Sequence, residues 1–232
     1  MRYAIISAGE GSRIAAEGSV LPKPMIPILG VPMIERLLDI FMRNGADRIA
    51  VIVNGENRDV VGLLSSLCGV MPIDLIVKKT PTPMHSLMEL APYLGCGRFC
   101  VTTVDTVFSE ARFAAMMDEF GVAGYDGMMG VTDFIDDEKP LYVSVDSEMG
   151  ITGFLDSGEG CRYVSAGIYA LQADALDILA RCIDSGQTRM RYFQRQLLES
   201  GMKLRAFDMG EVVDVDHVSD IAKAELIAAK RV

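Results

Sequence analysis

The sequence predicts an α/β protein with a mostly parallel sheet and helices on both of its faces. Short apolar segments rich in β-forming residues alternate with segments of helical periodicity, and the strand-like ones lie at 3–7, 49–53, 73–77 and 99–104. The clearest helix is expected between Pro32 and Arg43, where apolar residues recur on one face before Asn44-Gly45. Strands separated by helices imply right-handed βαβ crossovers, which place parallel strands next to each other.

The remaining elements follow the same patterns except in the middle of the chain. Further helices are expected at 59–67, 84–94, 172–184, 190–200 and 218–230. Between them, Gly and Asp turns divide short strand candidates with no long helix in between, at 127–131, 141–145, 150–155 and 163–169. This pattern predicts a small antiparallel elaboration of the sheet, of the kind that often forms the second wall of a ligand cleft.

Length and composition limit the class of protein. A chain of 232 residues predicts one domain, 1–232. Apolar residues make up 50% of the chain and charged residues 23%, which excludes intrinsic disorder. No stretch approaches about 18 uncharged apolar residues, so no membrane span is expected. The net charge of −10 argues against a nucleic-acid partner.

The start of the chain and its cysteines suggest a cytoplasmic protein. The short apolar run after Met1 ends in a glycine loop, which is typical of a first strand and not of a signal peptide. The cysteines form an odd, scattered set without a CxxC motif, and they are interpreted as reduced core residues: Cys68, Cys96, Cys100, Cys161 and Cys182.

The most informative segment is the glycine loop after the first strand. It runs Ser7-Ala8-Gly9-Glu10-Gly11-Ser12-Arg13, and Leu21-Pro22-Lys23-Pro24-Met25 follows it. A Gly-x-Gly turn at this place lets backbone N–H groups approach an anion closely. Neither a dinucleotide fingerprint nor a P-loop fits, because Ile14 replaces the third glycine and the Gly-Lys-Ser/Thr of a P-loop is absent.

Two cations near this loop are suited to a polyphosphate. The prolines on either side of Lys23 are expected to hold that stretch extended. Arg13 would then supply a fork for the terminal phosphates, and Lys23 a point charge for another oxygen. The alternative is an ordinary strand–helix turn with surface charges.

The order of these motifs resembles the nucleotidylyltransferases that join a nucleoside triphosphate to a sugar phosphate or a similar phosphorylated alcohol. The residues that carry the resemblance are the loop 8–13, the Pro22-Lys23-Pro24 triplet and the segment 27–34. Weaker matches continue at Tyr93-Leu94, Asp105, 166–169 and 213–224. The resemblance implies a three-layer, Rossmann-like fold of the GT-A type. It also implies a nucleotide-binding half at 1–125 and an acceptor-binding half at 126–232.

The resemblance also implies roles for particular residues. Arg13 and Lys23 would be catalytic, Asp105 and Asp216 would hold Mg²⁺, and the nucleotide would be bound by Ser7, Ala8, Gly9, Gly11, Ser12 and Ser86. For the two carboxylates, their positions relative to the predicted strands agree with a role as metal ligands. Asp105 follows a central strand, and Asp214 and Asp216 alternate with apolar Val213 and Val215, so that both carboxylates project from one face. The alternative for Asp105 and Asp216 is capping of the helices that follow them.

The acceptor is less well specified. Related sugar-phosphate enzymes carry Glu-Lys-Pro after a Gly-Phe, but Leu155-Asp156 follows Gly153-Phe154 here. Gly167, Arg189 and Arg191 are therefore tentative acceptor residues, with Arg195 as a further candidate. Solvated helix faces are the alternative for these arginines. Choline recognition would normally use an aromatic cage, and none is identifiable.

The function expected from all this is Mg²⁺-dependent transfer of a nucleoside monophosphate to a sugar 1-phosphate or similar phosphorylated alcohol. A CTP-dependent cytidylyltransferase acting on phosphocholine or a polyol phosphate is one alternative. A catalytically weak, nucleotide-binding regulatory paralogue is another, and a metal-dependent glycosyltransferase ranks last. The expected partners are the nucleoside triphosphate and the acceptor, with no nucleic acid or membrane and with homo-oligomerisation left open.

Overall fold

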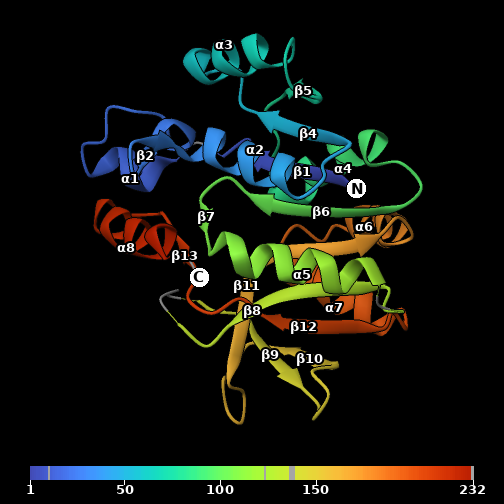
Figure 1. Cartoon of the computed structure of the whole chain (residues 1–232). Helices are drawn as coiled ribbons and strands as arrows, with labels where there is room; N and C mark the ends of the chain where they lie inside the picture. The colour runs from blue at the N-terminus through green and yellow to red at the C-terminus, as the bar shows by residue number, and fades with distance from the viewer. Residues whose placement is uncertain (10, 123, 136–138, 231–232) are drawn as a thin grey trace.

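One sheet forms the centre of the molecule in the computed structural model, which describes residues 1–9, 11–122, 124–135 and 139–230. Its strand order is β10-β9-β11-β6-β1-β4-β5, with β8 beside β11 and β12 beside β8 (Figure 1). The neighbours in the first half of the chain are parallel: β1 (Arg2–Ser7), β4 (Arg48–Val53), β5 (Ile73–Val77) and β6 (Arg98–Thr103).

The second half of the chain adds the antiparallel part of the sheet. Its strands are β8 (Gly127–Thr132), β9 (Tyr142–Val145), β10 (Ile151–Leu155), β11 (Tyr163–Gln172) and β12 (Leu204–Asp208). The long strand β11 pairs antiparallel with β6, β8 and β9, which joins the two parts. Strand β12 was not predicted, and it lies parallel to β8.

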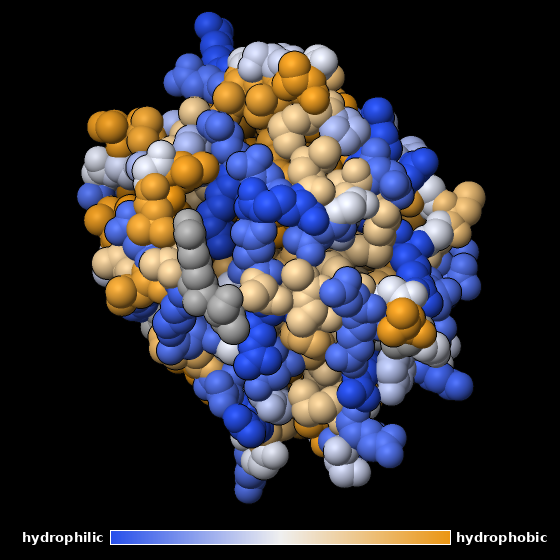
Figure 2. Space-filling model, viewed as in Figure 1, coloured by the Kyte–Doolittle hydropathy of each residue, from blue (hydrophilic) through white to orange (hydrophobic). Residues whose placement is uncertain are grey.

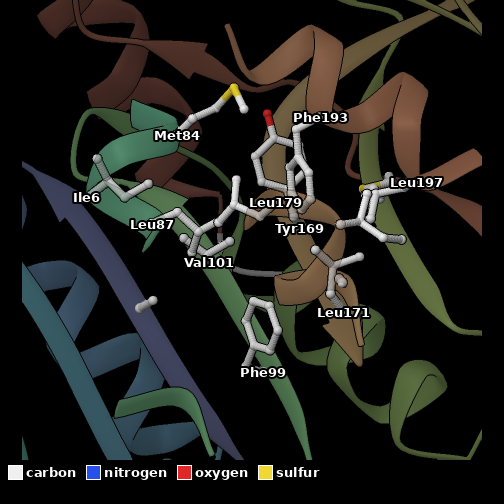
Figure 3. Packing of buried hydrophobic residues seen from close by; sticks show 14 of the residues in the cluster. Ile6, Met84, Leu87, Phe99, Val101, Tyr169, Leu171, Leu179, Phe193 and Leu197 are labelled. Atoms are coloured by element: carbon white, nitrogen blue, oxygen red, sulfur yellow. The ribbon is translucent and has the colours of Figure 1, made fainter. Parts of the chain in front are cut away.

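Helices cover both faces of the sheet, because alternate side chains of β1 point to opposite sides. Tyr3 and Ile5 pack with α2 (Met33–Arg43), α3 (Arg58–Leu67) and α5 (Glu110–Val122). Ala4 and Ile6 pack with α4 (Pro83–Leu94), α6 (Ala175–Asp184) and α7 (Met190–Glu199). Figure 3 shows the second of these cores, where Leu87, Leu179 and Phe193 meet side chains of the sheet. The predicted α/β architecture is confirmed.

A third, smaller core joins the two ends of the chain. It lies between α1 (Ser12–Ala16), the 3₁₀ turn η1 (Lys23–Met25), the hairpin β2 (Pro27–Ile28) and β3 (Val31–Pro32), the short antiparallel pair β7 (Thr106–Val107) and β13 (Val213–Asp214), and α8 (Val218–Ala229). Ile14 of α1 and Val215, Ala224 and Ile227 around α8 belong to it. In Figure 1, α8 therefore lies beside α1, although 200 positions separate Glu17 from His217.

Two local expectations were wrong. Lys23 is not extended but begins η1, in which Met25 N–H donates to Pro22 C=O (2.8 Å). Proline is compatible with the first turn of a helix, because the N–H that it lacks has no partner there. The cysteines are free, but only Cys100 and Cys182 are buried, whereas Cys68 and Cys96 are exposed. Within the described residues, no helix has the length and apolar character needed to cross a bilayer.

Candidate functional site

A cavity of about 280 Å³ opens where β1 and β6 end. The glycine loop after β1 borders it on one side, and residues 103–105 after β6 border it on another. Many of the predicted site residues line it: Ser7, Gly9, Gly11, Ser12, Arg13, Lys23, Asp105 and Asp216. The structure thus gathers residues from positions 7 to 216 around one hollow, at the carboxyl edge of parallel strands where open α/β sheets bind ligands.

Lys23 stands at the centre of this group. Its Nζ donates to Asp105 Oδ2 and to Asp216 Oδ1, the latter at 2.7 Å. Only 13% of the Lys23 side chain is exposed. Burial would lower the pKa of Lys23, but the Asp105 and Asp216 carboxylates outweigh burial and raise it. Lys23 is therefore charged at neutral pH and neutralises two carboxylates that would otherwise repel each other.

Asp216 is fixed by hydrogen bonds to both its carboxylate and its backbone N–H. Its Oδ2 accepts from Arg13 NH1 (2.5 Å), while Oδ1 accepts from Lys23. Its backbone N–H donates to Asp220 Oδ2 (3.2 Å), and so does the N–H of His217 (2.8 Å). Asp220 thereby caps α8, which is the role considered as an alternative for Asp216 itself. The carboxylate of Asp216 therefore does not cap the helix and lines the cavity instead.

Asp214 lies beside this group and outside the cavity lining. Its Oδ1 accepts from Thr106 Oγ1 (2.8 Å), and Thr106 Oγ1 also bonds to Thr103 Oγ1 (2.8 Å). Surrounding protein atoms and the negative charge of Asp105 raise the pKa of Asp214, although solvent reaches the residue and limits the effect of burial. The alternation predicted for this segment is present, because Val213 and Val215 are buried.

A contact that the sequence did not predict ties α1 to α8. Glu17 Oε1 bonds to His217 Nδ1 (2.5 Å), and Glu17 Oε2 accepts from Val218 N–H (2.8 Å). This hydrogen bond raises the pKa of His217 and lowers the pKa of Glu17. No local sequence signal pairs these residues, because Glu17 lies in no motif and 200 positions separate it from His217.

The glycine loop brings backbone and one buried hydroxyl to the cavity. Gly11 has a φ of +61°, and a Cβ at this position would lie 3.1 Å from Lys23 Cβ. A Cβ on Gly9 would meet no atom within 4 Å, so Gly9 leaves space open. The hydroxyl of Ser7 is buried and bonds to no described protein group. A buried hydroxyl without a partner is costly, and this one borders the hollow.

The segment before α4 forms a second polar group. Ser86 is buried, and its hydroxyl bonds to Thr80 Oγ1 (2.6 Å). His85 Nδ1 bonds to Thr82 Oγ1 (2.8 Å), and Thr82 is the N-cap of the helix. Pro83 of this segment lines the cavity, whereas Ser86 does not.

The tentative acceptor residues lie apart from the cavity lining. Arg191 NH1 pairs with Asp156 Oδ1 (2.7 Å), and Arg195 NH2 pairs with the same oxygen (2.9 Å). These bonds lower the pKa of Asp156 and fasten α7 to the end of β10. Arg189 is the exposed N-cap of α7. Gly167 interrupts the β11 register with a φ of +72°, and a Cβ there would lie 3.4 Å from Thr106 Oγ1.

Comparison with known proteins assigns the family. Residues 3–199 match the model of the MobA-like NTP transferase domain. The chain belongs to this family. The match ends before Asp214 and Asp216, so the carboxylates after β12 lie outside it.

Individual relatives of this NTP transferase are distant. A bifunctional protein GlmU of Methanococcus maripaludis (strain C7) is 25% identical over 234 residues, which cover 95% of this chain and 52% of the relative. The chain thus spans about half the length of the curated relatives that it matches.

Two solved structures show the same fold. A Bacillus anthracis protein described as a glucose-1-phosphate thymidylyltransferase, in complex with a sucrose, superposes with a TM-score of 0.86 at 20% identity, over 100% of this chain and 96% of that one. The inositol-1-phosphate CTP transferase from T. maritima gives 0.80 at 18% identity, over 99% and 98%. At these identities the likeness concerns the fold.

Proposed function

We propose that this NTP transferase moves a nucleoside monophosphate from a nucleoside triphosphate to a phosphorylated alcohol, such as a sugar 1-phosphate, and releases pyrophosphate. The observation that carries the proposal is the bonding of Lys23 to both Asp105 and Asp216, in a cavity bordered by the glycine loop. A basic and an acidic group of this kind, joined in one hollow, suit a polyanionic substrate that arrives with a cation.

In the proposed reaction, an oxygen of the acceptor phosphate attacks the α-phosphorus of the nucleotide. A new P–O bond forms, and the bond to the bridging oxygen of the β-phosphate breaks, so that the electron pair leaves with pyrophosphate. The nucleophile is already anionic at neutral pH and needs no general base. Catalysis would therefore consist of positioning and charge stabilisation. Arg13 and the loop N–H groups would hold the β- and γ-phosphates, and Lys23 would stabilise charge at the α-phosphate.

The residues present fit a magnesium ion. The Asp105 and Asp216 carboxylates converge on one positive charge, the ammonium of Lys23, which supports the view that the pair can hold a cation. Two carboxylates with additional phosphate oxygens and water are the ligands that Mg²⁺ prefers. When bound, Mg²⁺ would neutralise the triphosphate and increase the electrophilicity of the α-phosphorus.

The acceptor would lie on the side of the antiparallel strands. In this proposal residues 1–125 supply the nucleotide site and residues 126–232 the acceptor site. Asp216 is the exception, because it belongs to the second half of the chain but lines the cavity beside the glycine loop. Arg189 is the stronger candidate for the acceptor phosphate, because the Arg191 guanidinium already pairs with Asp156.

A second acceptor class is favoured by one observation. Asp156, which follows Gly153-Phe154-Leu155, carries a negative charge where sugar-phosphate enzymes place an acceptor lysine, and two arginines already pair with it. A CTP-dependent enzyme acting on phosphocholine or a polyol phosphate is therefore the second candidate. The likeness in fold to the inositol-1-phosphate CTP transferase agrees with it.

The test is a pyrophosphate-release assay with each of four nucleoside triphosphates, Mg²⁺ and a panel of phosphorylated acceptors. The panel contains sugar 1-phosphates, polyol phosphates and phosphocholine. Release with at least one pair, and its loss in Asp105→Asn, would support the proposal, and the preferred acceptor decides between the two candidates. Nucleotide binding without release for any acceptor would favour a regulatory, nucleotide-binding protein.

A further inference from the structure

Helix α1 carries Arg13 but has little to hold it in place. It has only five residues, too few for a helix that is stable by itself. Ile14 is its one buried side chain, and this residue packs into the small core with Val215 and Ile227. Gly11 and Gly18 flank the helix, both with positive φ. The position of α1 therefore depends on contacts that its polar side chains make.

Glu17, the residue after α1, makes the contact best placed for this purpose. Each of its carboxylate oxygens accepts one hydrogen bond, from His217 (2.5 Å) and from Val218 N–H (2.8 Å). Both donors belong to the start of α8, where a negative charge is favourable. In Figure 1, α8 lies beside α1, and the two hydrogen bonds of Glu17 join them.

The same two residues follow Asp216 directly. Asp220 accepts hydrogen bonds from the N–H groups of Asp216 and His217, and Glu17 bonds to the His217 side chain. One side chain thus links the helix of Arg13 with the strand end of Asp216, whose carboxylate lies between Arg13 and Lys23.

We infer that Glu17 is a positioning residue that holds α1 against α8, so that Arg13 and Asp216 face the nucleotide in one fixed geometry. The expected effect on nucleotide binding rests on the proposed function. The expectation that Glu17 fixes the position of α1 does not depend on that function. The Glu17 side chain is 40% exposed and does not line the cavity, so it acts through other residues.

An exposed pair of this kind contributes little to global stability. Glu17→Ala is therefore expected to leave the melting temperature nearly unchanged while it frees α1. Glu17→Gln keeps an oxygen for Val218 N–H and an amide for His217, and it should rescue the geometry without the charge. The matched control is Glu211→Ala, which removes an ion pair with Lys230 near the other end of α8 that is somewhat more exposed than the Glu17 pair.

The first readout is tryptic cleavage after Arg13, followed by mass spectrometry on the full chain without nucleotide. Cleavage in Glu17→Ala should be about tenfold faster than in the wild type, because proteolysis reports local opening. Glu17→Gln and Glu211→Ala should resemble the wild type. Equal cleavage in Glu17→Ala and the wild type would overturn the inference.

The second readout is nucleotide affinity. Each of the four nucleoside triphosphates is titrated with Mg²⁺ and without acceptor, and the one that the wild type binds is used. In this titration Glu17→Ala should raise the Kd for the nucleotide about tenfold. In the pyrophosphate-release assay it should raise the KM for the nucleotide about tenfold and change kcat less than about threefold, as expected when uniform binding is lost. Glu17→Gln should restore the Kd and the KM. Unchanged affinity would overturn the inference. Faster cleavage with no nucleotide bound even by the wild type would support the fixed α1 and refute the proposed function instead.

Discussion

Charge balance around single side chains governs the candidate site. Lys23 is largely buried and bonded to two carboxylates, while Asp214 lies close by with a raised pKa. The Lys23 ammonium holds Asp105 and Asp216 in place, and its removal would leave two carboxylates that repel each other at the edge of the cavity. The molecule carries a net charge of −10, so a polyanion can bind only where such local cations offset the overall repulsion.

Substitution of Lys23 tests the central residue. Lys23→Ala should lower the rate of pyrophosphate release by about 10²–10³-fold, the usual effect of removing one preorganised donor. The variant should remain folded, because the lost ammonium faces the cavity. Asp105→Asn should have an effect of similar size. Near-normal turnover in either purified, folded variant would remove that residue from the mechanism.

Substitution of Ser7 separates binding from stability. The Ser7 hydroxyl is buried and has no described protein partner, so Ser7→Ala should keep the free energy of unfolding or raise it by about 1–3 kcal/mol. If a bound nucleotide supplies the missing partner, its affinity should fall about five- to tenfold, the worth of one hydrogen bond. Urea unfolding and nucleotide titration measure the two effects. A large loss of stability with unchanged affinity would assign Ser7 to the fold alone.

At the scale of elements, short segments present the functional groups and long ones support them. The glycine loop, η1, β7 and β13 are brief, and each contributes a site residue or its partner. The buried strands β1 and β6 end beneath them. Such an arrangement lets loop backbone approach a ligand while the rigid sheet sets its position.

Gly11 is the point at which this arrangement is most sensitive. Gly11→Ala should cost about 1–2 kcal/mol in a left-handed conformation, and its Cβ would meet Lys23 Cβ at 3.1 Å. Nucleotide affinity should fall together with stability. Gly62→Ala in the interior of α3 is the control, because its Cβ meets nothing within 4 Å. This control should be neutral or slightly more stable than the wild type. Equal behaviour of the two variants would contradict the role given to the Gly11 conformation.

Local pattern predicted the parallel strands closely. Strand β5, the partly buried edge strand, lies at the predicted residues 73–77, and β4 and β6 begin one residue earlier than predicted. Strands β4 and β6 are mostly buried because both faces of the sheet are covered, and their sequences are correspondingly rich in apolar residues. The 3₁₀ turn at Lys23 was predicted as extended, since proline restricts φ without deciding between these conformations. The Met pairs at 116–117 and 128–129 are buried in the core.

At the scale of the whole molecule, three hydrophobic cores stabilise different parts of the structure. The two large ones cover the faces of the sheet, and the small one joins α1 to α8. The small core contains Val215, the residue before Asp216, and so keeps the Asp216 segment in place. Weaker packing in this core should therefore open the site before the rest of the molecule unfolds. Local stability of this kind varies across a structure.

Two substitutions that create cavities test this division. Ile227→Ala in α8 and Leu64→Ala in α3 each remove a buried aliphatic side chain, at a cost of about 2–5 kcal/mol. Ile227→Ala should raise the KM for nucleotide at a temperature at which the molecule is still folded. Leu64→Ala should lower the midpoint of urea unfolding with little change in KM. If both variants affected KM equally, the small core would not be a separate unit.

The sequence alone determined the α/β class, most of the buried strands and the residues of the glycine loop, because periodicity and turn chemistry are local properties. Only the tertiary structure decided that Asp216 lies 2.7 Å from Lys23, that Glu17 meets His217 and that β12 joins β8. These contacts join residues far apart along the chain. Their formation depends on how three cores pack at once, and no short segment encodes that.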